Sequence, residues 1–170
     1  MKSKNKYIFP LKKEDITEYG SNSPAHKGKY KYAIDFTVPE GTPIYASLSG
    51  EVVFIKDDSK IGGNDEKYSE FGNRIVIKHR NKEYSAYEHL KHKGAVVIKD
   101  QKIKTGQLIG YSGNTGWSHK PHLHFEVFTN PTKNESEGKT VAIQFENVNK
   151  KKIQRVFTRS RKVLSKHRIL

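Results

Sequence analysis

Apolar and polar residues alternate along most of the chain before residue 149, which is typical of β-strands with one buried face. The clearest case is 122–128, where three apolar residues alternate with two histidines and a glutamate. Glycine, proline and asparagine separate this run from others of the same kind. The predicted strands are 32–38, 44–46, 50–55, 74–79, 82–87, 95–98, 102–103, 108–111, 122–128 and 140–145.

No segment before residue 149 shows sustained helical spacing. We therefore predict an all-β fold, a compact antiparallel hybrid of sandwich and barrel built from many short strands. A length of 170 residues suits one domain with a substantial core. The predicted organisation is a basic arm at 1–25, a β domain at 26–148 and a basic tail at 149–170. A long polar stretch at 57–73 is predicted to be a functional loop.

The net charge of +14 is concentrated at the two ends of the chain. Residues 1–13 hold five lysines and no acid, and residues 149–170 hold nine Lys or Arg and no acid. The centre, 14–148, carries eighteen basic and eighteen acidic side chains. This neutral centre argues against a dedicated nucleic-acid reader, which would place basic residues on its folded surface. The charged ends are interpreted either as solvated arms or as tethers to a polyanion.

The tail has a helical pattern of its own. Its apolar residues fall near one face, with basic residues around them, which predicts a basic amphipathic helix. Packing on the domain, or disorder, is the alternative. These apolar residues are Ile153, Val156, Phe157, Val163 and Leu164. No apolar run is long enough for a transmembrane segment, and the first residues lack the apolar core of a signal peptide.

Several residues are candidates to bind a metal. His122 and His124 project from the same face of their predicted strand, and imidazole nitrogen is a common zinc ligand. Two histidines capping a surface strand are the alternative. Asp35 lies within an apolar strand and needs a partner, which a metal ion would supply. With no cysteine in the chain, a metal must be held by His, Asp or Glu.

Seven short motifs follow one another in a fixed order. They are Pro-Glu-Gly-Thr-Pro-Ile at 39–44, Gly50, Gly-Asn at 72–73, Tyr-Glu-His-Leu at 87–90, Gly-Gln-Leu-Ile-Gly at 106–110, Gly-Asn-Thr-Gly at 113–116 and His-Leu-His-Phe-Glu at 122–126. In this order and spacing, over residues 26–128, the chain resembles the lysostaphin-type zinc metalloendopeptidases. Enzymes of that family cut peptide bonds in bacterial peptidoglycan.

The resemblance implies three zinc ligands and two catalytic histidines. The implied ligands are His26, Asp35 and His124, and the implied catalytic residues are His89 and His122. Many members of the family place the first ligand four residues before the aspartate, where this chain has Lys31. His26 stands nine residues before Asp35, a spacing that resembles a branch of the family with a Tyr-Ala-x-Asp-Phe strand.

These assignments predict a mechanism. Three protein ligands leave a fourth position for water, whose pKa zinc lowers to roughly 7. His122 is expected to accept the water's proton. His89 is expected to stabilise the oxyanion or to protonate the leaving amine. The residues expected to bind substrate are Asn73, Asn114, Trp117 and His119.

The predicted function is zinc-dependent hydrolysis of peptidoglycan, at a cross-bridge or a stem-peptide crosslink. The alternative is a non-catalytic wall-binding or regulatory module on the same fold, against which the presence of all five site residues argues. The basic ends are then candidates to bind an anionic wall polymer. A wall hydrolase would act in the cell wall or outside the cell; a cytoplasmic or phage-released protein is the other expectation. His79 and His92 are expected at the surface.

Overall fold

A computed structural model describes residues 1–21, 23 and 25–146, and its many short strands confirm the all-β prediction. None of the helices in this part of the chain is long and apolar enough to cross a membrane. The tail with its predicted helix lies outside the described residues. The strands are β1 (Lys2–Tyr7), β2 (Glu18–Gly20), β3 (Ile34–Thr37), β4 (Pro43–Tyr45), β5 (Gly50–Lys56), β6 (Gly62–Gly63), β7 (Arg74–Lys78), β8 (Tyr84–Glu88), β9 (Leu90–Ala95), β10 (Lys102–Ile103), β11 (Leu108–Ser112), β12 (Gly116–Trp117), β13 (His122–Thr129), β14 (Lys139–Thr140) and β15 (Ala142–Phe145). The 3₁₀ helices are η1 (Lys13–Asp15), η2 (Gly28–Tyr30), η3 (Glu66–Phe71) and η4 (Arg80–Lys82).

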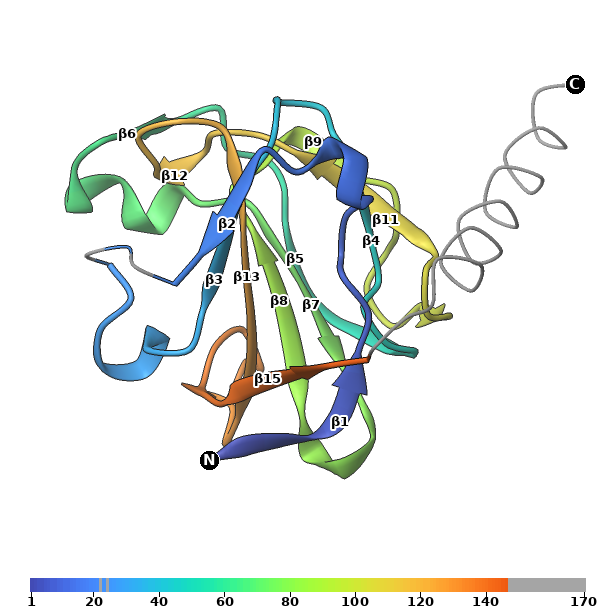
Figure 1. Ribbon diagram of the computed structural model, residues 1–170. Helices are drawn as coiled ribbons and strands as arrows, with labels where there is room; N and C mark the ends of the chain where they lie inside the picture. Colours follow the sequence, from blue (N-terminus) through green and yellow to red (C-terminus); the bar gives the residue numbers. More distant parts are fainter. Residues whose placement is uncertain (22, 24, 147–170) are drawn as a thin grey trace, which may run out of the picture.

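One antiparallel sheet organises the domain, with the strand order β10-β5-β7-β8-β13-β3-β2 and β14 beside β13 (Figure 1). A second sheet has the order β4-β11-β9. Two parallel pairs, β1 with β15 and β12 with β6, complete the described part of the chain. Within that part the strands do not close into a barrel.

The main core lies on one face of the large sheet. Register places Ile75, Tyr87 and Phe125 side by side on β7, β8 and β13, and all three are fully buried. They belong to the same apolar cluster as residues of β4, β9 and β11, including Leu90 and Ile109. Burying one such side chain stabilises the fold by about 1.5–3 kcal/mol, so this face is the main source of stability.

The segment 1–25, expected as a basic arm, contributes strands and core side chains. β1 has three exposed lysines on one side, whereas Ser3, Asn5 and Tyr7 are buried on the other. The carboxylate of Glu83 accepts hydrogen bonds from the backbone of Asn5, at 3.0 Å, and from the Tyr7 hydroxyl, at 3.1 Å. β2 pairs with β3 at the edge of the main sheet. These residues are therefore part of the folded body.

The other face of the main sheet carries a row of charged and polar side chains. Cross-strand register aligns Arg74 of β7 with Glu88 of β8, Glu88 with His124 of β13, and His124 with Asp35 of β3. Because side chains directly opposite one another in a sheet share a face, all four lie on the face away from the main core. This row builds the site described next.

Candidate metal centre

Three side chains from distant parts of the sequence converge at one end of this row. One ligand atom from each of His26, Asp35 and His124 lies within 4.8 Å of the other two. Nδ1 of His124 is 3.0 Å from Oδ1 of Asp35, and Nε2 of His26 is 3.2 Å from the same oxygen. The two nitrogens are 3.3 Å apart. Two imidazole nitrogens and one carboxylate oxygen are typical zinc ligands, so this cluster could hold a metal ion.

His26 reaches the cluster from the segment that precedes η2. Its Nδ1 lies 3.2 Å from the carbonyl oxygen of Ser21, an acceptor only, so Nδ1 carries the proton. The unprotonated Nε2 is the atom that faces Asp35 and His124. The tautomer is therefore the one that a metal ligand requires.

Electrostatics favour an ionised Asp35. Burial alone would raise the pKa of this carboxyl, but its close contacts with the rings of His124 and His26 hold it well below the ordinary value. Burial likewise opposes a charge on His124, whereas its contacts with the carboxylates of Asp35 and Glu126 raise its pKa well above the ordinary value. The cluster thus attracts positive charge.

His122 is buried beside the cluster, with Nε2 3.6 Å from Oδ1 of Asp35. Its Nδ1 lies 2.9 Å from the carbonyl oxygen of Lys120 and 3.0 Å from the hydroxyl of Ser118. The Ser118 hydroxyl in turn donates to Oδ1 of Asn114 at 2.6 Å. Nδ1 is therefore the protonated nitrogen, and burial lowers the pKa of the ring. A neutral His122 presents the lone pair of Nε2 to the site.

His89 follows β8 and has a positive φ of 62°, a conformation that is uncommon for any residue except glycine. Its Nδ1 donates to the carbonyl oxygen of Thr115 at 2.7 Å. Its ring centroid lies 4.5 Å from that of His122 and 5.8 Å from that of His124. Burial, together with the charges of those two histidines, lowers the pKa of His89 to about 4. His89 is thus neutral at neutral pH, with Nε2 unprotonated.

Asn73 was expected to bind substrate, and the structure places its side chain in the interior of the fold. The side chain is fully buried, and its amide nitrogen donates to the carbonyl oxygens of Ser59 and Leu90 at 2.9 and 3.3 Å. The backbone N–H of Asn73 donates to the hydroxyl of Thr115 at 3.0 Å, and that hydroxyl donates to Leu90. Asn73 therefore holds the segment that anchors His89 and has no group left for a substrate.

The other expected substrate residues border the site. Trp117 is 36% exposed at the end of β12, and His119 is exposed in the segment before β13. Asn114 is half-buried and tied to Ser118. The predicted loop at 57–73 contains β6 and η3, and β6 pairs with β12. A side chain at Gly62 would place its Cβ 2.0 Å from the carbonyl oxygen of Asn114, so glycine allows this close approach.

Sequence reasoning assigned no role to three charged residues behind His124, one of them buried and two half-buried. Glu126 is fully buried, with Oε2 3.5 Å from Nε2 of His124. Nη1 of Arg74 lies 3.6 Å from Oε1 of Glu88. Burial opposes the ionisation of Glu88, but the charges of His124 and Arg74 lower its pKa. Glu126 stands in the motif at 122–126, but the alternation along 122–128 placed it on the polar face of a half-buried strand, so its burial was not predicted.

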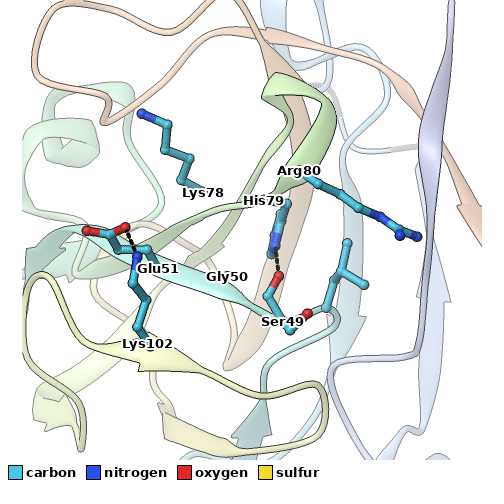
Figure 2. Close-up of a pocket in the computed structure, with 8 residues that line it drawn as sticks. Ser49, Gly50, Glu51, Lys78, His79, Arg80 and Lys102 are labelled. Carbon is cyan, nitrogen blue, oxygen red and sulfur yellow. Dashed lines mark hydrogen bonds and ion pairs between the residues drawn. The ribbon is translucent and has the colours of Figure 1, made fainter.

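A separate hollow of about 510 Å³ lies at the other end of β7, lined by Lys78, His79, Arg80 and Lys102 among others (Figure 2). His79 was expected at the surface, which is wrong: the ring is buried and hydrogen-bonded to the carbonyl oxygen of Ser49 and the hydroxyl of Ser85. His92, also expected at the surface, is half-buried. The cations already have partners, since Lys102 binds Glu51, Lys78 binds Glu135 at 2.8 Å, and Nε of Arg80 donates to Asn5 at 2.9 Å. We infer a structural role for this region.

Comparison with known proteins identifies the family. Residues 29–137, more than half of the chain, match Peptidase family M23. The peptidoglycan DD-endopeptidase ShyA of Vibrio cholerae is 42% identical over 93 residues, which cover 55% of this chain and 19% of ShyA. The glycyl-glycine endopeptidase ALE-1 of Staphylococcus capitis is 35% identical over 116 residues, covering 68% of this chain and 29% of ALE-1. The chain therefore spans less than a third of the length of these relatives.

Solved structures show the same fold. The catalytic domain of a variant of the prophage-encoded M23 protein EnpA from Enterococcus faecalis superimposes with a TM-score of 0.54 and 26% sequence identity. The alignment covers 79% of this chain and 87% of that domain. The chain thus corresponds in extent to an M23 catalytic domain.

Proposed function

This chain belongs to peptidase family M23, and from that premise we propose that it is a zinc-dependent endopeptidase that hydrolyses peptide bonds of peptidoglycan. The substrate class follows from the curated relatives, one a peptidoglycan DD-endopeptidase and the other a glycyl-glycine endopeptidase. The bond cut is accordingly either in the stem-peptide crosslink or in a glycine bridge.

One observation carries the proposal: the convergence of His26, Asp35 and His124 within 4.8 Å. Their donor set fits zinc, because two imidazole nitrogens and one carboxylate oxygen complete a three-ligand catalytic site. His124 also satisfies the second requirement of such a site, since the nitrogen that does not face the cluster lies beside a buried carboxylate. A zinc ion held here would polarise the scissile carbonyl and lower the pKa of a water molecule.

The protein's own contribution to the reaction comes from His122 and His89. Each ring donates its Nδ1 proton to a backbone carbonyl, of Lys120 and Thr115 respectively. Nε2 is therefore the atom of each ring that exchanges protons with the substrate and the water. With centroids 4.5 Å apart, the two rings act as a pair that takes up one proton from the attacking water and returns one to the leaving amine.

The proposed role of His89 refines the expectation from the sequence. A neutral ring with its proton on Nδ1 cannot donate a hydrogen bond from Nε2. His89 therefore stabilises the oxyanion or protonates the amine only after it has itself taken up a proton. Its lowered pKa makes it a strong proton donor in that state.

The proposal is tested by digesting purified peptidoglycan and identifying the released fragments by mass spectrometry. The zinc-loaded protein should release fragments with new amino and carboxyl termini, and the fragment masses distinguish a D-alanyl crosslink from a glycine bridge. Chelation of the metal and His124→Ala should each abolish release. Wall binding without any new termini would instead support the non-catalytic module.

A further inference from the structure

The buried carboxylate of Glu126 lies behind His124, on the side away from the candidate metal position. Nδ1 of His124 faces Asp35 at 3.0 Å, whereas Nε2 faces Oε2 of Glu126 at 3.5 Å. Within the described part of the chain, Nε2 of His124 and both oxygens of Glu126 are buried and have no hydrogen-bond partner. Buried polar atoms of this kind need a partner, because an unsatisfied group costs about 1–3 kcal/mol.

The two unsatisfied groups are matched to each other. Nε2 of His124 is a donor when Nδ1 is the ligand atom, and a carboxylate is an acceptor only. A movement of a few tenths of an ångström would turn the 3.5 Å contact into a hydrogen bond of ordinary length. Both residues lie on β13 and point to the same face, so the contact requires no change of the backbone.

Two further residues hold Glu126 in a charged environment. Glu88 is the cross-strand partner of His124, and Arg74 is the cross-strand partner of Glu88. Nη1 of Arg74 lies 3.6 Å from Oε1 of Glu88, so this cation and this carboxylate offset each other beside His124.

We propose that Glu126 is a positioning residue that fixes His124 with Nδ1 toward the metal ion. This inference rests on the proposed function in its requirement for a bound zinc ion. Glu126 acts through His124 and does not touch the substrate.

The test compares zinc affinity, measured by competition with a chelating dye, for the wild-type protein, Glu126→Gln and the matched control Glu40→Gln. Glu126→Gln should bind zinc about 10–100-fold more weakly, the usual effect of losing such a partner. Glu40 is exposed in a turn, so Glu40→Gln should leave the affinity unchanged. Equal zinc affinity of Glu126→Gln and the wild type would overturn the proposal. Absence of zinc binding to the wild type would instead refute the proposed function.

A change in the geometry of the metal ligand separates positioning from a structural role. Cobalt(II) titration should give an altered visible spectrum in Glu126→Gln, since the orientation of the ligand changes.

A further test uses only the wild-type protein, so its outcome does not depend on whether a variant folds. In the zinc-loaded protein, long-range ¹⁵N–¹H NMR should identify His124 as protonated at Nε2 and metal-bound at Nδ1. The opposite tautomer, with the metal on Nε2, would overturn the proposal even if every variant were unstable.

Discussion

Asp35 and His124 are directly opposite each other on the antiparallel strands β3 and β13, with Oδ1 and Nδ1 3.0 Å apart. Their positions are fixed by the same register that buries Phe36 against Leu123 one residue further along. A slip of one residue by either strand would move its polar side chain to the core face. The core thus sets the geometry of the candidate metal centre, to which only His26 comes from outside the sheet.

The two histidines of β13 should have different roles. We expect His124→Ala to lose zinc, whereas His122→Ala should retain one zinc per chain and lose activity by about 10²–10⁴-fold, the usual contribution of a general base. Zinc content by elemental mass spectrometry and peptide hydrolysis, measured on the same samples, check this. Loss of zinc in His122→Ala would mean that His122 is a ligand.

Asn73→Ala should impair catalysis at a distance. The change removes the donor to the carbonyl oxygen of Ser59 and one of the two donors to that of Leu90, which should lower the free energy of unfolding by about 1–3 kcal/mol. Because Asn73 and Thr115 hold the segment that orients His89, kcat should fall while zinc affinity stays unchanged. Denaturant unfolding measures the loss of stability, steady-state kinetics measure kcat, and zinc titration measures the affinity for the metal. An unchanged kcat would exclude the anchoring role.

His79 should make stability depend on pH. Burial lowers its pKa to about 4 in the folded protein, below the ordinary value near 6.5, so the folded state favours the neutral ring. The resulting stability is present above about pH 6.5 and is lost as the pH falls toward 4. Between pH 7.5 and 4.5 the wild type should lose about 2 kcal/mol more than His79→Gln, a variant that cannot take up this proton. Urea unfolding at both pH values measures the difference, and parallel losses would contradict the assignment.

The basic tail should affect binding to the wall and not the chemistry. Replacing its nine Lys and Arg residues by glutamine should weaken sedimentation with purified cell walls, because the attraction to an anionic polymer is lost. Cleavage of a small peptide should stay unchanged. The difference in wall binding should disappear at high salt, which screens such interactions. Equal binding of both proteins at low salt would favour a solvated tail.

The alternation of apolar and polar residues predicted those strands that have one apolar face. It failed for strands whose buried side chains are polar. β5, β7, β8, β11 and β13 were located to within a few residues. β1 was missed because the residues it buries include Ser3 and Asn5, which are hydrogen-bonded. The strand predicted at 95–98 overlaps β9 only at Ala95, and Val96 and Ile98 are exposed. Apolar residues in the irregular segment after β9 produced that false pattern.

Some site residues could be predicted from the sequence, and others could be recognised only in the structure. The family resemblance implied His26, Asp35 and His124 as ligands, and the structure brings these three residues together. The burial of Asn73 could not be predicted, because nothing in the Gly-Asn motif at 72–73 distinguishes a side chain that binds substrate from one that holds the fold. Arg74 and Glu88 become interpretable only when the register of β7 and β8 is known. Single-strand patterns carry no information about which residues of two strands lie opposite each other.

The most direct test of the account is the zinc stoichiometry of the purified protein and of His26→Ala. His26 is the ligand that comes from outside the sheet, and it has the least usual spacing. We predict one zinc ion per wild-type chain and at least about 100-fold weaker binding in His26→Ala, since a ligand is lost. A wild-type protein that binds no zinc, or a His26→Ala variant that binds it as tightly as the wild type, would contradict the proposed metal centre.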